Sequence, residues 1–185
     1  VELAPQVFIA ADPEMVEPLH QQLRLHSVDL RLGTSATAFH EQEGRLQVQL
    51  SDGESVEAGL VVMAVGVRPE VKVAKEAGLD VGATGGIVVD EHQRTSDPSI
   101  YAVGDAVEIT QYVSGQKALI PLAGPANRQG RIAVDNIFGR SSVYRNTQGT
   151  AICKVLDLAI GMTGLSENAL KRAGIAHEKI YIHPA

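Results

Sequence analysis

The sequence is poor in the features of secreted and membrane proteins. It has no tryptophan, 4% aromatic residues and one cysteine, Cys153, in 185 residues. A single cysteine excludes an intrachain disulfide framework and suits a reducing compartment. No apolar run approaches the ~20 residues that span a bilayer, and the start, VELAPQV, lacks the basic and apolar regions of a signal peptide. We therefore expect a cytoplasmic protein without a membrane segment.

Clustered positive charge is also missing. The chain has 16 Lys and Arg against 22 Asp and Glu, a formal net charge of −6. Because nucleic-acid binding relies on clustered Lys and Arg, nucleic acid is not expected as a partner. The 6 histidines are scattered without ligand spacing, so no metal site is predicted. With 44% hydrophobic and 21% charged residues, the composition is that of a globular chain of one or two domains.

The periodicity of apolar residues predicts alternating helices and strands. Helices are predicted from Asp12 to about His26, over 71–78, from Pro121 to about 138, and after a cap at Ser166. Strands are predicted over 28–32, 34–39, 45–50, 60–65, 85–90, 100–103, 107–113, 152–156, 158–162 and 179–182. The run 60–65, LVVMAV, is apolar on both faces, so it is expected to be a central strand of a parallel sheet.

Residues 95–105 read TSDPSIYAVGD and deliver a glycine and an aspartate at a strand end. Gly104 lets the backbone approach a ligand closely, and ionised Asp105 can accept hydrogen bonds from two sugar hydroxyls. A Gly-Asp pair is also common in tight turns, where the aspartate is solvated or caps a helix. The eleven-residue run resembles the second flavin-binding signature of the pyridine nucleotide-disulfide oxidoreductases, which implies that Asp105 contacts the ribityl chain of FAD.

Other segments extend the resemblance over nearly the whole chain. Glu2, the DPEM helix, the AVGVRPE turn and residues 85–106, 120–139 and 154–170 are similar to coenzyme A disulfide reductases and the related NADH oxidases and peroxidases. The implied fold is α/β, of the three-layer FAD/NAD(P)-binding type, with the start of an α+β dimerisation domain. The implied limits are 1–68 for the C-terminal part of the NAD(H)-binding domain, 69–146 for the second segment of the FAD-binding domain, and 147–185 for a truncated dimerisation domain.

The resemblance also implies roles for individual residues. Glu2 would accept hydrogen bonds from the adenosine ribose and favour NADH over NADPH, unless it is simply a surface acid. Gly66 would lie where the chain returns from the nicotinamide domain to the flavin domain and would allow a close passage of the backbone there. The alternative is an ordinary turn at the end of a strand. Pro121, Leu122 and Ala123 would begin a helix whose amino end stabilises negative charge on the reduced flavin, or an ordinary surface helix.

Three further side chains are candidates for a role, two on the same helix and one elsewhere. Asn127 and Gln129 either assist at the flavin or belong to the polar face of the helix. Cys153 is expected to be a small core residue, because the redox cysteine of the family lies far upstream.

No GxGxxG loop occurs in the sequence; the nearest segment, GATGG at Gly82, lies between a helix and a strand. The family carries two such loops and the redox cysteine before the position of Glu2. The resemblance therefore implies an inactive, cofactor-free fragment of a homodimeric FAD-dependent enzyme. That enzyme takes hydride from NAD(P)H and reduces a small disulfide such as coenzyme A disulfide. The alternatives are an NADH oxidase or peroxidase, and a non-catalytic flavoprotein piece.

Overall fold

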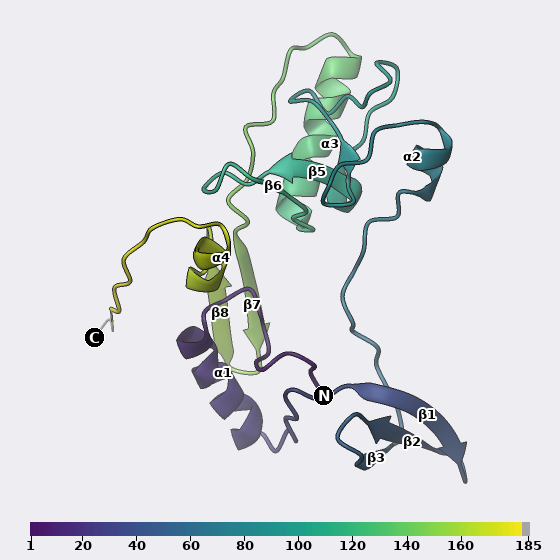
Figure 1. Ribbon diagram of the computed structural model, residues 1–185, viewed down its shortest axis with the longest axis vertical. Coiled ribbons are helices and arrows are strands. Elements are labelled where there is room, and N and C mark those ends of the chain that lie inside the picture. Colours follow the sequence, from purple (N-terminus) through teal and green to yellow (C-terminus); the bar gives the residue numbers. More distant parts are fainter. Residues whose placement is uncertain (183–185) are drawn as a thin grey trace. The chain divides into compact units, whose positions relative to one another are not determined.

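The computed structural model describes residues 1–182, and the chain divides into two compact units. Unit 1 contains Val1–Gly66 and Ile152–Gly161, and unit 2 contains Val67–Ala151 and the chain from Met162. Figure 1 shows the elements of both units along the chain. The domain limits expected from the sequence stay a prediction. Among residues 1–182, no helix is long and apolar enough to cross a membrane.

Helix α1 of unit 1 runs over Pro13–Leu25, as the sequence predicts. Asp12 stands at its N-cap position, and Pro13 fits the first turn because its missing N–H would have no partner there. Val16 and Leu19 are buried together with Ala11 and with Ile160 of the β7–β8 hairpin. This hairpin joins β7 (Ala151–Val155) to β8 (Leu158–Met162). Cys153, expected to be a core residue, is partly buried and packs against the same cluster.

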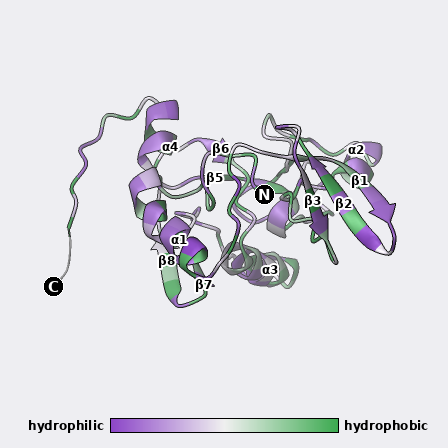
Figure 2. Cartoon of the chain, turned by 90° about the horizontal axis from the view of Figure 1, so that it is seen from below, coloured by the Kyte–Doolittle hydropathy of each residue, from purple (hydrophilic) through white to green (hydrophobic). Residues whose placement is uncertain are grey.

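The sheet of unit 1 is an antiparallel meander of β1 (Ala36–Gln42), β2 (Arg45–Leu50) and β3 (Ser55–Ala58). Val48 of the central strand is buried and pairs with Phe39 on one side and Val56 on the other. Figure 2 shows hydrophobic residues, in green, interrupting hydrophilic ones along the β1–β2 hairpin. The strand predicted over 45–50 is therefore confirmed.

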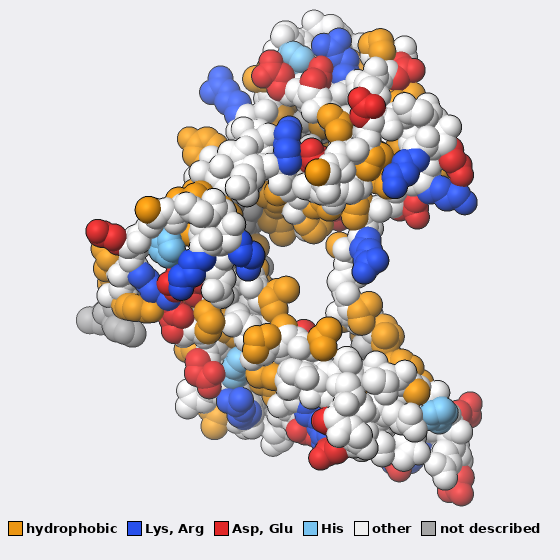
Figure 3. All heavy atoms as spheres, in the orientation of Figure 1, with side chains coloured by type: hydrophobic (Ala, Val, Ile, Leu, Met, Phe, Trp, Pro, Cys, Tyr) orange, Lys and Arg blue, Asp and Glu red, His pale blue; other side chains and the backbone are white. Residues whose placement is uncertain are grey.

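Two strands predicted for unit 1 do not form. Within 28–32, only Leu32 forms a bridge, which is parallel and pairs with Glu2. The run 60–65 pairs with no strand of the described residues, and its Leu60 and Val65 are 78% and 82% exposed. Figure 3 shows apolar side chains, in orange, along this segment between β3 and α2. A strand needs a backbone partner, and none of the described residues supplies one here.

The sheet of unit 2 is short and mixed. Strand β5 (Val107–Thr110) pairs in parallel with β4 (Ile87–Val88) and antiparallel with β6 (Lys117–Ala118). The helical elements are α2 (Lys72–Glu76), the short 3₁₀ turn η1 (Gly104–Ala106), α3 (Ala123–Ile137) and α4 (Glu167–Arg172). Val107 and Ile109 of β5 are buried with Ile132 of α3 and with Tyr144. This core holds the end of β5 near α3.

Some predicted elements of unit 2 are confirmed and others are wrong. The hydroxyl of Ser166 accepts the N–H of Ala169 and caps α4, as predicted. Residues 100–103 are not a strand, and only Tyr101 forms a bridge, to Arg94. Residues 179–182 are not a strand either, because they pair with no neighbour within the described chain.

Gly86 provides a first test of unit 2. A Cβ at this position would lie 2.7 Å from the backbone nitrogen of Glu108 and from Cδ2 of Leu119. We expect Gly86→Ala to lower the free energy of unfolding by about 1–3 kcal/mol, because backbone cannot move aside easily. Urea unfolding measures this change. Gly124→Ala in α3, where a Cβ meets nothing within 4 Å, is the control; equal loss in both variants would contradict the packing described here.

Candidate functional site

The Gly-Asp pair at 104–105 forms η1, directly before β5. Gly104 has a φ of 83°, a conformation that favours glycine, and its N–H donates to Oε1 of Gln129 at 2.7 Å. Gln129 is only 2% exposed. The amide of Gln129 therefore fixes the turn from α3, a role that neither reading of this residue anticipated. The Asp105 side chain is exposed and makes no hydrogen bond within residues 1–182.

Asp105 opens onto a cavity of about 1030 Å³ whose other wall is one face of α3. Small residues dominate the first half of that face, which leaves room for a ligand beside the backbone. The residues of α3 that line the cavity are Ala123, Ala126, Asn127, Gly130, Arg131, Val134 and Asp135. The structure therefore places Asp105 and Ala123 at one cavity, and a role of these residues in cofactor binding stays a prediction.

The amino end of α3 lies at this cavity and has no side-chain cap. Leu122 is the N-cap residue, and no side chain accepts a hydrogen bond from the first turn. Pro121 precedes it and is exposed. Free N–H groups and the positive end of the helix dipole favour negative charge at this position. Asn127 donates from Nδ2 to the carbonyl of Ala123 at 2.9 Å, so its amide nitrogen is tied to its own helix.

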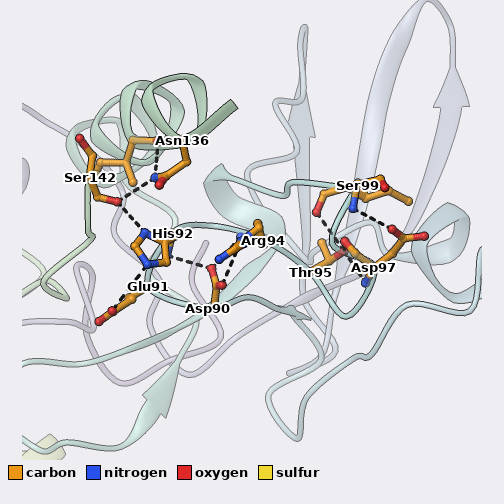
Figure 4. A network of polar contacts seen from close by, with 11 residues as sticks. Asp90, Glu91, His92, Arg94, Thr95, Asp97, Ser99, Asn136 and Ser142 are labelled. Carbon is orange, nitrogen blue, oxygen red and sulfur yellow. Dashed lines mark hydrogen bonds and ion pairs between the residues drawn. The ribbon is translucent and has the colours of Figure 1, made fainter. Parts of the chain in front are cut away.

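Side-chain hydrogen bonds stabilise the polar turns over residues 90–99, as Figure 4 shows. A carboxylate oxygen of Asp90 accepts the N–H of His92 at 2.8 Å, and Asp97 accepts the N–H of Ser99 at the same distance. The His92 ring also contacts the carbonyl oxygen of Ser142 at 2.9 Å. Asp97 therefore stabilises a turn within the run that ends at the 104–105 pair.

The GATGG segment wraps a buried carboxylate. Glu108 in β5 is 6% exposed and accepts the Thr84 hydroxyl at 2.7 Å and the Thr84 N–H at 3.1 Å. A Cβ on Gly82 would lie 2.2 Å from Oε2 of Glu108. Gly82 therefore makes room for a side chain of the protein itself.

The pH dependence of unfolding tests this contact. The Thr84 hydroxyl lowers the pKa of the Glu108 carboxyl below its ordinary 4.5, against desolvation, which raises it. A carboxyl with a lowered folded-state pKa contributes stability above 4.5 and loses that contribution as the pH falls through the folded-state value. We expect Glu108→Gln to be less stable than wild type at neutral pH and to lose less stability on acidification. Parallel urea midpoints for the two proteins over the acid range would contradict this expectation.

Glu2 and Gly66 lie in unit 1 and are described within it. The main-chain N–H of Glu2 donates to the Arg31 carbonyl at 2.8 Å, and its Oε1 accepts the Ala4 N–H at 2.8 Å. Gly66 has a φ of 85°, and a Cβ added at this position would meet no described atom within 4 Å. The positive φ alone explains why glycine occupies this position. The close passage of the backbone between the two domains stays a prediction.

The candidate site therefore combines an exposed carboxylate, in the turn before β5, with the uncapped start of α3 in an α/β unit. Residues 1–130 match the model of the pyridine nucleotide-disulphide oxidoreductase family, and the chain belongs to that family. It is 36% identical over 163 residues to the NAD(P)H sulfur oxidoreductase (CoA-dependent) of Pyrococcus furiosus, covering 88% of this chain and 36% of that protein. It is 37% identical over 167 residues to an NADH oxidase of Methanocaldococcus jannaschii, covering 90% and 37%.

Solved structures agree with this assignment. The reduced CoADR-RHD of Bacillus anthracis is 42% identical, with a TM-score of 0.90, covering 95% of this chain and 31% of that one. An NAD-dependent persulfide reductase of A. fulgidus is 38% identical, with a TM-score of 0.89, covering 94% and 32%. The predicted fold class, α/β with partial dinucleotide-binding domains, is confirmed. The chain spans about a third of the length of these relatives.

Proposed function

We propose that the full-length protein carrying this chain is a FAD-dependent NAD(P)H:disulfide oxidoreductase. It takes hydride from a nicotinamide nucleotide and passes two electrons to a small disulfide, with coenzyme A disulfide as the favoured substrate. The main support is the exposed carboxylate of Asp105, placed across a cavity from the uncapped start of α3. The name of the Pyrococcus relative supports a coenzyme A-linked sulfur substrate.

The residues at the cavity fit a flavin. FAD, when bound, supplies the two-electron acceptor for hydride. Asp105 would accept hydrogen bonds from ribityl hydroxyls. Gly104 has no Cβ, so a ligand could approach its backbone closely. The N–H groups at Ala123 would stabilise negative charge that develops beside them, because their dipoles are already oriented. Gln129 contributes indirectly by fixing Gly104.

Glu2 supports NADH as the reductant. Its Oε1 is held by the Ala4 N–H, and Oε2 makes no hydrogen bond within residues 1–182. An acid in this place accepts from ribose hydroxyls and repels the phosphate of NADPH.

Substituting Glu2 tests the choice of nucleotide. We expect Glu2→Ser to lower the ratio of kcat/KM for NADH to that for NADPH by about 10- to 100-fold. This factor corresponds to the binding free energy of a hydrogen bond to a charged group. Steady-state rates with both nucleotides in the full-length protein measure it. Glu41→Ser, on the exposed strand β1, is the control. An unchanged ratio in Glu2→Ser would contradict the ribose role.

Thiol release tests the reaction. Oxidation of one NADH with one proton reduces one coenzyme A disulfide to two coenzyme A thiols, so anaerobic assays should yield thiol and NAD⁺ in that proportion. The alternative is an NADH oxidase or peroxidase, favoured by the likeness to the Methanocaldococcus NADH oxidase. It predicts NADH consumption that depends on dioxygen or peroxide. Failure of the full-length protein to oxidise NADH with any of these acceptors would contradict both functions.

The remaining expectations belong to the same proposal. A homodimer is supported by apolar residues such as Ile152 of β7, which is 78% exposed, in the segment expected to be a dimerisation domain. A cytoplasmic location is supported by the single cysteine.

A further inference from the structure

A buried histidine in α1 contacts the loop that follows Glu2. His20 is 5% exposed, and its Nε2 lies 3.2 Å from the backbone nitrogen of Val7. Its Nδ1 lies 3.0 Å from Oε2 of Glu17. A backbone N–H can only donate, so Nε2 is the acceptor and Nδ1 carries the proton that is donated to Glu17. The two contacts therefore select one neutral tautomer of His20.

The loop over residues 3–11 depends on few other polar contacts. Gln6 is buried and donates from Nε2 to the Ala11 carbonyl at 2.9 Å. Phe8 has a φ of 48°, which a residue with a side chain adopts only when its surroundings hold it there. Val7 and Phe8 pack against the buried cluster of α1 and β8. The His20 bond is thus placed one residue before the strained position.

The beginning of the same loop orients Glu2. The Ala4 N–H donates to Oε1 of Glu2 at 2.8 Å, and the Ala4 carbonyl accepts the Gly33 N–H at 3.0 Å. A shift of the loop would therefore change where the Glu2 carboxylate points.

We propose that His20 is a positioning residue for the nicotinamide nucleotide. By accepting the Val7 N–H, it holds the 3–11 loop in the conformation in which Ala4 orients Glu2. This role rests on the ribose contact proposed for Glu2. His20 acts through the loop and is not assigned to the chemistry of hydride transfer.

The charged side chains near the imidazole lie on α1 and on the β7–β8 hairpin. On α1, Glu17 faces Nδ1, and Arg24 pairs with Glu17 at 3.4 Å. The hydrogen bond from His20 is the main cause that lowers the pKa of Glu17. The 3–11 loop has no charged side chain, and the β7–β8 hairpin contributes Lys154 and Asp157, the latter 3.8 Å from His26. A proton on Nε2 would leave the Val7 N–H without its acceptor, while Glu17 would stabilise the imidazolium.

The experiment compares two substitutions in the full-length protein. His20→Phe keeps a ring but removes the acceptor, whereas the amide oxygen of His20→Gln can still accept the Val7 N–H. We expect His20→Phe to raise KM for NADH about 5- to 10-fold with kcat unchanged, as for the loss of one hydrogen bond used in binding. His20→Gln should keep KM for NADH close to the wild-type value, because its amide oxygen can replace the acceptor. His40→Phe, on exposed β1, is the control.

Amide hydrogen exchange distinguishes a failure of the positioning role of His20 from a failure of the proposed function. In the same proteins, a peptide covering the 3–11 loop should exchange faster in His20→Phe than in wild type and His20→Gln. If the loop exchanges as expected but wild type does not oxidise NADH, the proposed function fails and the nucleotide role of His20 fails with it. If NADH is oxidised but KM and loop exchange are equal in His20→Phe and wild type, the positioning role alone is overturned. A similar loss of kcat in both His20 variants would also overturn it.

Discussion

The 185-residue chain expressed by itself is expected to purify without colour and to bind added FAD at least about 1000-fold more weakly than the full-length protein. Asp105 and the start of α3 supply contacts from one side of an open cavity. The sequence contains no GxGxxG loop, which would place a helix amino end against the pyrophosphate. The 1000-fold loss of FAD affinity corresponds to two charge-assisted hydrogen bonds to the pyrophosphate that this chain cannot make, at about 2 kcal/mol each.

Visible absorbance of the purified chain and a fluorescence titration with FAD measure this expectation. The full-length protein, purified in the same way, is the reference and should be yellow. Stoichiometric flavin in the 185-residue chain would contradict the prediction, because it would mean that Asp105 and the start of α3 suffice for tight binding.

Replacing Asp105 by alanine in the full-length protein is expected to weaken FAD binding by about 100- to 10,000-fold. The estimate corresponds to two hydrogen bonds to a charged group at about 1.5–3 kcal/mol each. Because Asp105 is exposed and bonds to nothing within residues 1–182, folding should be unaffected. Flavin content after dialysis and the urea midpoint distinguish a lost ligand from a lost fold.

Two further substitutions sharpen this comparison. Asp105→Asn keeps the shape but removes the charge, so its affinity should lie between those of the alanine variant and wild type. Asp97→Ala lies in the same eleven-residue run, where Asp97 accepts the Ser99 N–H in a turn, and it should retain flavin. Wild-type affinity in Asp105→Ala would show that this carboxylate does not hold the ribityl chain.

Elements whose signals are local were predicted well. Helix α1, strand β2 and helix α3 follow from apolar spacing and from residues at their ends, and these act within a few positions of the chain. The roles expected of Gly104, Asp105 and the start of α3 rest on the family resemblance and stay predictions.

Features that depend on distant partners were not predictable from local pattern. The run 60–65 has the composition of a buried strand, yet strand formation requires neighbours that the described residues do not provide. Gln129 looked like a polar-face or flavin-side residue, whereas its burial and its bond to Gly104 arise from the fold. Glycines 82 and 86 are explained only once Glu108 is seen beside them. The Val7–His20 contact joins residues 13 positions apart, and no motif marks it.

Anaerobic titration of the full-length protein with NADH tests the central claim most directly. The account predicts a protein that carries FAD and loses its visible flavin absorbance on addition of stoichiometric NADH, and then regains it when coenzyme A disulfide is added. A full-length protein that binds no flavin, or whose bound flavin stays oxidised in the presence of NADH, would contradict it.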